Sequence, residues 1–346
     1  MSKRTEITRR TFTVSSIFGV FGLAMHRTTH AQDLETYQRL DLHKSFDIER
    51  TVNGHSVKDL GEQPPVPEDA QYNPCVEAYP QPNTPRGTIK RFDEWAESRI
   101  YTNTRRALSI YVPAQISKTE GAVPVIVFND GDTYLNEKGP FRATAVLDSL
   151  VHSAQIKPTV GVFVMWGCVP GATNKVWHAD GKLDHLARNQ RGFEYDSLTD
   201  TYVRFIAEEV LPFAERQVGR KFSTNPGERT ICGFSSGGIC AFNAAWHNPK
   251  VFGRVLSHCG SFVNLRGGHN FPYLVRSTER KPIRIFLQSG KKDLNYVWGN
   301  WALANQQMAS AFEFSGYDFK FVFGEGGHSL RHGGAIFSDS LRWLWR

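Results

Sequence analysis

From about residue 87 onward, short apolar runs alternate with longer amphipathic stretches. The apolar runs lack the polar alternation of a half-exposed strand, which is typical of strands buried on both faces of a mainly parallel sheet. They cover 107–112, 123–128, 160–166, 230–233, 254–258, 283–287 and 319–323. Helical patterns lie between them, around 140–154, 198–217 (with Pro212 as an interruption or boundary), 236–247, 299–315 and 334–345. The pattern predicts an α/β fold with a mainly parallel central sheet and helices on both faces.

Residues 1–31 have the pattern of an export signal. Basic residues come first, and a weakly apolar stretch of residues 11–25 follows, too short to span a bilayer comfortably. Arg9-Arg10-Thr11-Phe12 resembles the twin-arginine signature. We therefore expect a bacterial protein exported to the periplasm or the medium, without stable membrane insertion; an uncleaved amphipathic tail is the alternative.

Residues 32–86 are polar and end in a stretch rich in proline, which favours extended structure. We expect an N-terminal arm here, with a separate small domain as the alternative. The catalytic domain is then expected to cover residues 87–346.

Charge and cysteine content exclude several classes of protein. The formal charge of the 346-residue chain is +7, but much of the excess lies in residues 1–31, and the rest has no long basic run. Nucleic-acid binding is therefore not expected. Five cysteines without CxxC spacing favour neither a zinc site nor a disulfide framework, although one disulfide stays open.

A nucleophile motif follows one of the predicted buried strands. Gly233-Phe234-Ser235-Ser236-Gly237 matches G-x-S-x-G, with a strand pattern before it and a helix pattern rich in small residues after it. Strand, sharp turn and helix form the nucleophile elbow of serine hydrolases. Ser235 is therefore the candidate nucleophile. Ser236 is the neighbouring alternative, but its position suits an N–H donor of the oxyanion hole.

A serine nucleophile needs a base that is oriented by an acid, in the chain order Ser, acid, His. Asp293 follows the strand pattern at 283–287, and His328 lies in a glycine-rich loop after 319–323. Glu325 is the competing carboxylate. His332 follows His328 by four residues, but no third ligand accompanies the pair, so no metal is expected. His258 is expected to be a core residue.

The remaining candidates are placed by the ends of other strands. Asp132 follows the strand at 123–128 and is the candidate for the second oxyanion N–H donor, beside Ser236. Side chains near the strand ends are candidates for binding the substrate. They are Tyr134, Trp166, Arg191, Glu194, Trp298 and Trp301.

Over residues 87–346 the chain resembles the enterochelin-esterase-like branch of the putative esterase family. The resemblance rests on Asp130-Gly131, Glu194-Tyr195-Asp196, the Ser235 elbow with Gly238, the loops at 290–293 and 299–301, and Gly326-Gly327-His328. It implies an α/β-hydrolase fold and a carboxylic-ester hydrolase without metal or organic cofactor. Members of the family cleave siderophore, feruloyl, acetyl and simple acyl esters, and mycolyl-type acyltransferases are related.

The residues and the resemblance together predict a serine esterase that works through an acyl-enzyme. The substrate is expected to be a small-molecule or polysaccharide-linked ester, of an aryl, carbohydrate or siderophore type. Residues 32–86 do not match the N-terminal domain of siderophore esterases, which favours an aryl or acidic sugar ester. An acyltransferase and an inactive binding protein on the same fold are the alternatives.

Overall fold

The computed structural model describes residues 51–52, 55–56, 65–172 and 185–346. The chain divides into two units, Met1–Leu40 and Asp41–Arg346, and all described residues belong to the second. The expected export signal and residues 32–50, 53–54 and 57–64 of the expected arm lie outside the described residues. Two short strands, β1 (Thr51–Val52) and β2 (His55–Ser56), pair with each other.

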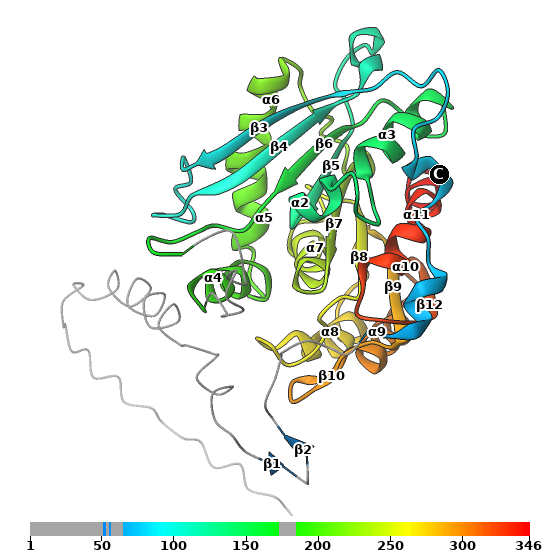
Figure 1. The fold of residues 1–346 in the computed structure, drawn as a ribbon. Coiled ribbons are helices and arrows are strands. Elements are labelled where there is room, and N and C mark those ends of the chain that lie inside the picture. The colour runs from blue at the N-terminus through cyan, green and yellow to red at the C-terminus, as the bar shows by residue number, and fades with distance from the viewer. Residues whose placement is uncertain (1–50, 53–54, 57–64, 173–184) are drawn as a thin grey trace, which may run out of the picture. The chain divides into compact units, whose positions relative to one another are not determined.

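Eight strands form the central sheet, in the order β12-β9-β8-β7-β5-β6-β4-β3 (Figure 1). β4 runs antiparallel to both of its neighbours, β3 and β6, and every other pair of adjacent strands in this sheet is parallel. The strands are β3 (Thr88–Trp95), β4 (Arg106–Val112), β5 (Val125–Asn129), β6 (Val160–Val164), β7 (Arg229–Phe234), β8 (Arg254–His258), β9 (Arg284–Lys292) and β12 (Asp318–Gly327). Every apolar run named above overlaps one of these strands, which confirms the predicted α/β-hydrolase fold.

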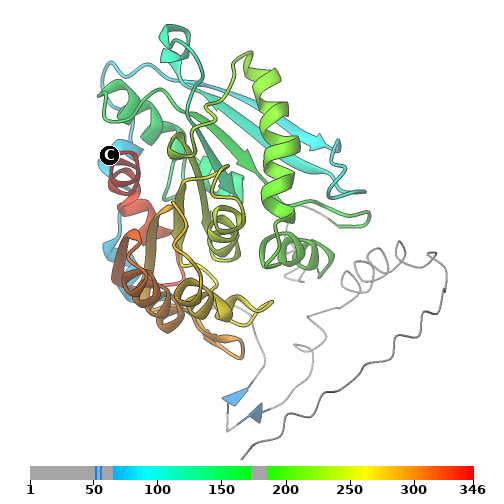
Figure 2. The same ribbon diagram turned by 180° about the vertical axis from the view of Figure 1, so that it is seen from behind.

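Helices cover both faces of this sheet, as the two opposite views show (Figures 1 and 2). Along β5, Val125 and Val127 belong to one hydrophobic core, and Ile126 and Phe128 belong to the other. Successive side chains of a strand point to opposite faces, so one apolar run supplies both cores. The first core lies against α5, α6, α7, α8 and α9, and the second against α2, α3 and α11.

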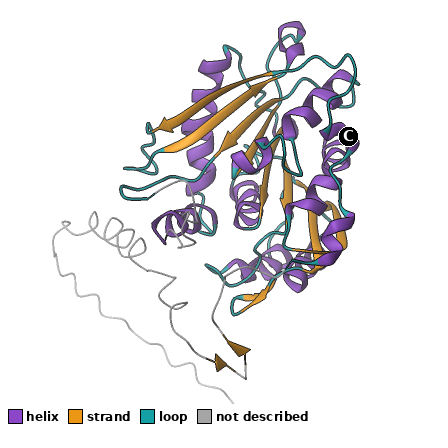
Figure 3. Cartoon of the chain, viewed as in Figure 1, coloured by secondary structure: helices purple, strands orange, loops and turns teal. Residues whose placement is uncertain are grey.

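Figure 3 shows the helices as a layer on either side of the strands. The α-helices are α2 (Gly131–Leu135), α3 (Ala143–His152), α4 (His185–Tyr195), α5 (Thr201–Phe205), α6 (Leu211–Val218), α7 (Ser236–His247), α8 (Phe271–Ser277), α9 (Trp301–Phe314), α10 (Leu330–Ala335) and α11 (Phe337–Trp345). Shorter elements are η1 (Pro67–Gln71), η2 (Val76–Ala78), η3 (Ala114–Lys118), η5 (Pro226–Glu228), η6 (Gly268–Asn270), β10 (Asn295–Tyr296) and β11 (Gly299–Asn300).

Pro212 marks a change of helix type rather than an end. A single π-helical turn, η4 (Ile206–Val210), joins α5 to α6, and Pro212 lies in the first turn of α6. Proline lacks an N–H, so a π turn before it accommodates the missing hydrogen bond without ending the helix.

The second half of the expected arm runs along the sheet edge formed by β12. η1 and η2 precede β3, and the main-chain N–H of Cys75 donates to the carbonyl of Gly334 on α10. The five cysteines, all in the described part of the chain, are free thiols. None of the described helices has the length and apolar character needed to cross a membrane.

Candidate active site

Ser235 lies in a strained turn between β7 and α7. Its φ of 59° is positive, a region that residues other than glycine avoid. Main-chain hydrogen bonds hold this turn. The N–H of Ser235 donates to the carbonyl of His258, and the carbonyl of Ser235 accepts the N–H groups of Gly238 and Ser261. A Cβ at Gly233 would lie 2.1 Å from the carbonyl oxygen of Gly237, so only glycine allows this approach of strand and helix. The sequence therefore folds here into the predicted elbow.

A continuous chain of hydrogen bonds joins Ser235, His328 and Asp293. Ser235 Oγ lies 2.9 Å from His328 Nε2, and His328 Nδ1 lies 2.5 Å from Asp293 Oδ1. The three side chains come from the carboxyl ends of β7, β12 and β9, which meet at one edge of the sheet. The structure thus brings together the three residues that the sequence singled out from distant positions.

The Asp293 carboxylate is prepared to stay charged. Burial alone raises the pKa of this carboxyl, but His328 and hydrogen bonds from Ser289 Oγ (2.7 Å) and the N–H of Leu294 (2.8 Å) outweigh burial, so its pKa is below the ordinary value. Its side chain is fully buried, whereas that of His328 is 12% exposed. A charged acid beneath a partly exposed imidazole favours the tautomer that accepts a proton at Nε2.

Within the described residues, Cys259, Asp293 and His328 form a group of possible metal ligands. Two of them are the candidate acid and the candidate base. His328 Nδ1 and Asp293 Oδ1 are joined by a hydrogen bond, so these two atoms face each other rather than a shared ion. Their arrangement suits proton transfer.

Ser261 is a site residue that the sequence analysis did not name. Its Oγ lies 3.3 Å from Ser235 Oγ and accepts a hydrogen bond from Trp301 Nε1 at 3.0 Å. When Ser235 donates its proton to His328 Nε2, the Ser261 hydroxyl is left as the donor to Ser235 Oγ. Ser261 follows β8 by three residues, so the rule that active sites gather at the carboxyl ends of parallel strands could have found it.

A cavity of about 150 Å³ opens beside Ser235. Besides Ser235 itself, four of the expected residues line it: Ser236, Arg191, Trp298 and Trp301. The other lining residues are Arg188, Asn189, Gly192, Asp196, Ser261, Leu265, Arg266 and Leu294. The cavity therefore has aromatic and aliphatic walls together with three arginines and one carboxyl group.

Charge in this cavity is set by α4. Arg191 forms a bidentate ion pair with Asp130 (2.9 and 2.7 Å). Burial, and the nearby charge of Arg191, lower the pKa of Arg188 to about 10, so it stays cationic at neutral pH. Burial raises the pKa of the Asp196 carboxyl to about 6, against the opposing effect of Arg191 and Ser236. Helical spacing places Arg188 one turn before Arg191 and was the signal available for it.

Three expected substrate-binding residues do not line this cavity. Tyr134 is fully buried against Phe141, and its hydroxyl lies 3.1 Å from His258 Nδ1 in the core. Glu194 is fully buried in a bidentate ion pair with Arg106. Trp166 lies beneath the Arg191 guanidinium, whose Cζ is 5.7 Å from the centroid of the Trp166 ring. A position near a strand end does not determine which way a side chain points, and the structure does not bring these three residues to the wall of the cavity.

Asp132 lies after β5, at the same edge of the sheet. Its N–H donates to the thioether sulfur of Met165 at 3.4 Å, a weak acceptor that a substrate oxygen can replace. Its carboxylate is held by Arg91 on β3 at 2.7 and 3.0 Å. The ion pair fixes the turn that presents this N–H.

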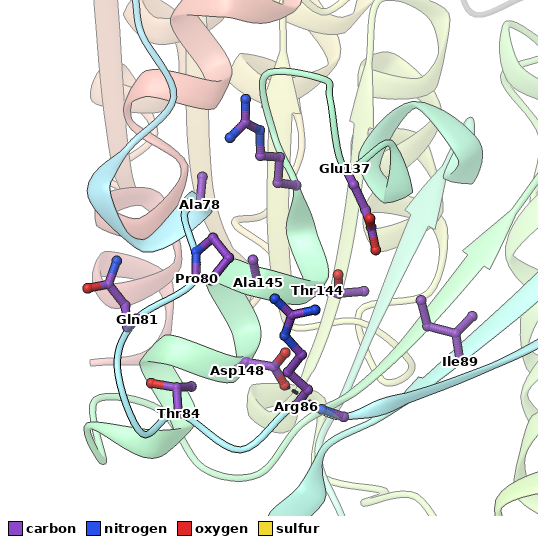
Figure 4. A pocket seen from close by; sticks show the side chains of 12 residues that line it. Ala78, Pro80, Gln81, Thr84, Arg86, Ile89, Glu137, Thr144, Ala145 and Asp148 are labelled. Carbon is purple, nitrogen blue, oxygen red and sulfur yellow. Dashed lines mark hydrogen bonds between the residues drawn. The ribbon is translucent and has the colours of Figure 1, made fainter.

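A second cavity, of about 280 Å³, shares no residue with the first (Figure 4). Residues 78–89 of the arm and β3 form one wall, and Thr144, Ala145 and Asp148 of α3 form another. Asp148 accepts the hydroxyl of Tyr111 (2.6 Å) and the N–H of Gly87 (2.8 Å), so its contacts bind the arm to α3. None of the residues predicted for the active site lies here.

A sequence model of the family described as "Putative esterase" matches residues 100–334. An iron(III) enterobactin esterase of Dickeya dadantii is 32% identical over 156 residues (40% of this chain, 34% of the relative). One of Escherichia coli is 27% identical over 259 residues (73% and 55%). This chain thus spans about half, or less, of the length of these curated relatives.

Solved structures show the same fold. The enterobactin esterase of Shigella flexneri superposes with a TM-score of 0.57 at 22% identity, covering 84% of this chain and 66% of the other. A ferulic acid esterase of Anaeromyces mucronatus, solved with ferulic acid, superposes with a TM-score of 0.56 at 14% identity, covering 79% and 96%. The family match covers more than half of the sequence and includes all three residues of the hydrogen-bonded chain. The chain therefore belongs to the putative esterase family.

Proposed function

We propose that this protein is a serine carboxylic-ester hydrolase with Ser235 as nucleophile, His328 as general base and Asp293 as the acid that orients the histidine. The observation that carries the proposal is the hydrogen-bonded chain from Ser235 Oγ through the imidazole to a buried carboxylate, beside a cavity that can receive an acyl group.

The reaction follows from this geometry in two steps. His328 Nε2 takes the proton of Ser235 while Oγ attacks the ester carbonyl, and the N–H groups of Ser236 and Asp132 receive the oxyanion. Each such donor is worth about 3 kcal/mol in a preorganised site. The imidazolium then protonates the leaving alcohol, and a water molecule, deprotonated by the same nitrogen, releases the acid from the acyl-enzyme.

The cavity favours the ester of an aromatic or acidic acyl group. Trp298 and Trp301 offer aromatic faces, and the arginines of the cavity offer charge to an anionic substituent. Two of the neighbouring structures were solved with compounds that carry an aromatic acyl group, ferulic acid and dihydroxybenzoyl serine. We infer an aryl ester as the substrate class, with carbohydrate-linked and siderophore esters as its natural forms.

We also propose export to the periplasm or the medium, on the basis of Arg9-Arg10 and the apolar stretch that follows. Cell fractionation of the full chain, beside Arg9→Lys/Arg10→Lys, tests this. The proposal predicts that the double lysine variant stays in the cytoplasm; equal export of both chains would contradict the twin-arginine route.

Hydrolysis of an ester panel tests the activity. The panel holds p-nitrophenyl acetate and butyrate, methyl ferulate, an acetylated xylan and a catecholate siderophore. We expect turnover of at least one ester, a loss of roughly 10⁴-fold or more for Ser235→Ala, and wild-type turnover for Ser310→Ala, an exposed serine on α9. A folded wild type inert on every ester, or an active Ser235→Ala, would overturn the proposal. Products with added acceptor alcohols distinguish an acyltransferase.

A further inference from the structure

The loop that carries His328 leaves the sheet before it reaches the histidine. β12 pairs with β9 up to Gly324, and the ladder is then irregular until Gly327 pairs with Lys292. The main-chain N–H groups within this irregular part need partners outside the ladder. His328 follows directly, so whatever holds these groups also places the imidazole.

The N-terminal arm supplies these partners. The hydroxyl of Tyr72 accepts the N–H of Glu325 at 3.0 Å, and Oδ1 of Asp69 accepts the N–H of Gly327 at 3.1 Å. Both side chains come from η1 and its C-cap, more than 250 residues earlier in the chain. In Figure 1 the blue arm runs beside β12 and α10.

The fit between arm and loop is close. A Cβ at Gly326 would lie 2.3 Å from Asp69 Oδ1, and one at Gly327 would lie 2.6 Å from Cγ2 of Val66. A Cβ at either position would require the arm to shift. The glycines before His328 therefore allow the close approach of the arm, and Gly327 also lies near the carbonyl of Lys292 on β9.

The arm also contacts the loop of the acid. Glu68 forms an ion pair with Lys292, which precedes Asp293. The Tyr72 ring stacks on His332 of α10, with centroids 4.2 Å apart and planes at 17°. His332 is in turn held by Gln288 on β9 at 3.0 Å. One short segment therefore connects the loops of the base and the acid.

We propose that residues 66–72, the clamp, position His328 for catalysis, with Asp69 and Tyr72 as positioning residues that act through the main chain of the histidine loop. This inference rests on the proposed function. A displacement of a catalytic group by about 1 Å can lower a rate by about 100-fold. Residues 66–72 are not among the residues that line the substrate cavity, and the contacts named above fall on the loops of the base and the acid and on α10, so loss of the clamp should lower kcat and leave KM unchanged.

The test compares four single variants and one double variant of the full chain with wild type. Asp69→Ala removes the acceptor of the Gly327 N–H, Asp69→Asn keeps a carbonyl oxygen there, and Tyr72→Phe removes the acceptor of the Glu325 N–H but keeps the ring stack. Glu77→Gln is the matched control, because it weakens another arm contact, the ion pair with Arg342 on α11, that does not touch the histidine loop.

Three readouts are taken: kcat and KM on the best ester, thermal unfolding, and amide hydrogen exchange at Glu325 and Gly327. We expect kcat of Asp69→Ala/Tyr72→Phe to fall by about 10- to 100-fold with KM within about twofold. Exchange should accelerate at Gly327 in Asp69→Ala and at Glu325 in Tyr72→Phe. Asp69→Asn should recover most of the activity and protection, and Glu77→Gln should behave as wild type.

The proposal is overturned if kcat of the double variant falls by no more than about threefold, or if Glu77→Gln lowers kcat as much as the double variant does. A parallel rise in KM, or a failure of Asp69→Asn to recover activity, would equally exclude positioning through these hydrogen bonds. Hydrogen exchange separates the two proposals: if the wild type hydrolyses no ester, the proposed function fails, while the exchange rates still decide whether the arm holds the loop.

Discussion

Ser235 shows how much of the local structure serves one side chain. Its positive φ costs on the order of 1–3 kcal/mol, and it persists because its own N–H and carbonyl, Gly233 and the start of α7 all require the same turn. The turn at Ser235, the proposed nucleophile, is strained. We therefore expect substitutions near it to relax the turn and reduce activity before they unfold the protein.

The choice between two carboxylates is decided at the residue level. Asp293 is buried against His328, whereas Glu325 is exposed and forms an ion pair with Lys291. We expect Asp293→Ala to lower kcat by about 10³- to 10⁴-fold, because the imidazole loses both its orientation and its counter-charge. Glu325→Ala, the matched control, should change kcat by less than about threefold. Steady-state kinetics on one ester measures both, and comparable losses would contradict the assignment.

Asp196 should make stability depend on pH. Its pKa is raised to about 6 in the fold by burial, so the folded protein holds this proton more tightly than the unfolded chain does. The stabilisation is complete below the ordinary pKa and is lost as pH rises through about 6. The free energy of unfolding of wild type, relative to Asp196→Asn, should therefore decline by about 2 kcal/mol between pH 4 and pH 7.5.

Urea unfolding of both proteins across this range measures the decline. Asp200→Asn, which removes a carboxylate from an exposed aspartate near the same helices, serves as the matched control. A difference for Asp196→Asn that does not vary with pH would show that this carboxyl does not hold its proton more tightly in the fold.

Residues of the site differed in how far the sequence could predict them. Ser235, Asp293 and His328 were singled out because a motif, a chain order and the ends of strands agree on them. Glu194 and Tyr134 do not reach the cavity because polar and aromatic side chains near a strand end can turn inward to a partner in the core, such as Arg106 or His258. Arg188 was missed although its helical spacing from Arg191 was a signal, and Arg266 was missed because surface and cavity arginines have the same local pattern.

Helix α4 is joined to the sheet by a buried ion pair. Arg106 on β4 and Glu194 on α4 are both fully buried, and Glu194 also accepts the N–H of Gly167 at 3.0 Å. The pair thus fixes the helix that also supplies Arg191 to the cavity. Removing one partner leaves an uncompensated charge, which is far more costly than removing both.

We expect Arg106→Met to lower the free energy of unfolding by about 3–5 kcal/mol. Arg106→Met/Glu194→Gln should recover a large part of this loss, since glutamine keeps an acceptor for Gly167 without the charge. Chemical denaturation of the two single variants and the double variant gives the coupling energy. Additive losses would show that the two side chains do not depend on each other.

Among the elements, the buried strands were predictable and the edge strand β3 was not. Its residues Thr88–Trp95 are mostly exposed and include Lys90, Arg91, Asp93 and Glu94, so neither an apolar run nor strict alternation marks it. Charged residues on an edge strand protect it from pairing with other chains. The charged residues that keep β3 from being predicted by its hydrophobic pattern are therefore the same residues that suit it to the edge of the sheet.

For the molecule as a whole, the α/β-hydrolase fold followed from the alternation of buried strands and helices, because each period matches one kind of element and parallel strands need crossover helices. The course of the arm could not be predicted in the same way. The contacts of the arm depend on single side chains, such as Asp69 and Tyr72, that hydrogen-bond to a loop distant in sequence. A local periodicity in the sequence does not predict such contacts.

The clamp also has a consequence for the order in which the molecule is completed. Asp69 and Tyr72 leave the ribosome long before the loop they hold, which is 258 and 253 residues further on. Synthesis proceeds from the N-terminus, and contacts between distant segments form late. A nascent chain can therefore form the Ser235 turn before β12 has been synthesised and can contact the arm. His328, the proposed base, also follows β12, so an unfinished chain carries the proposed nucleophile Ser235 without this partner.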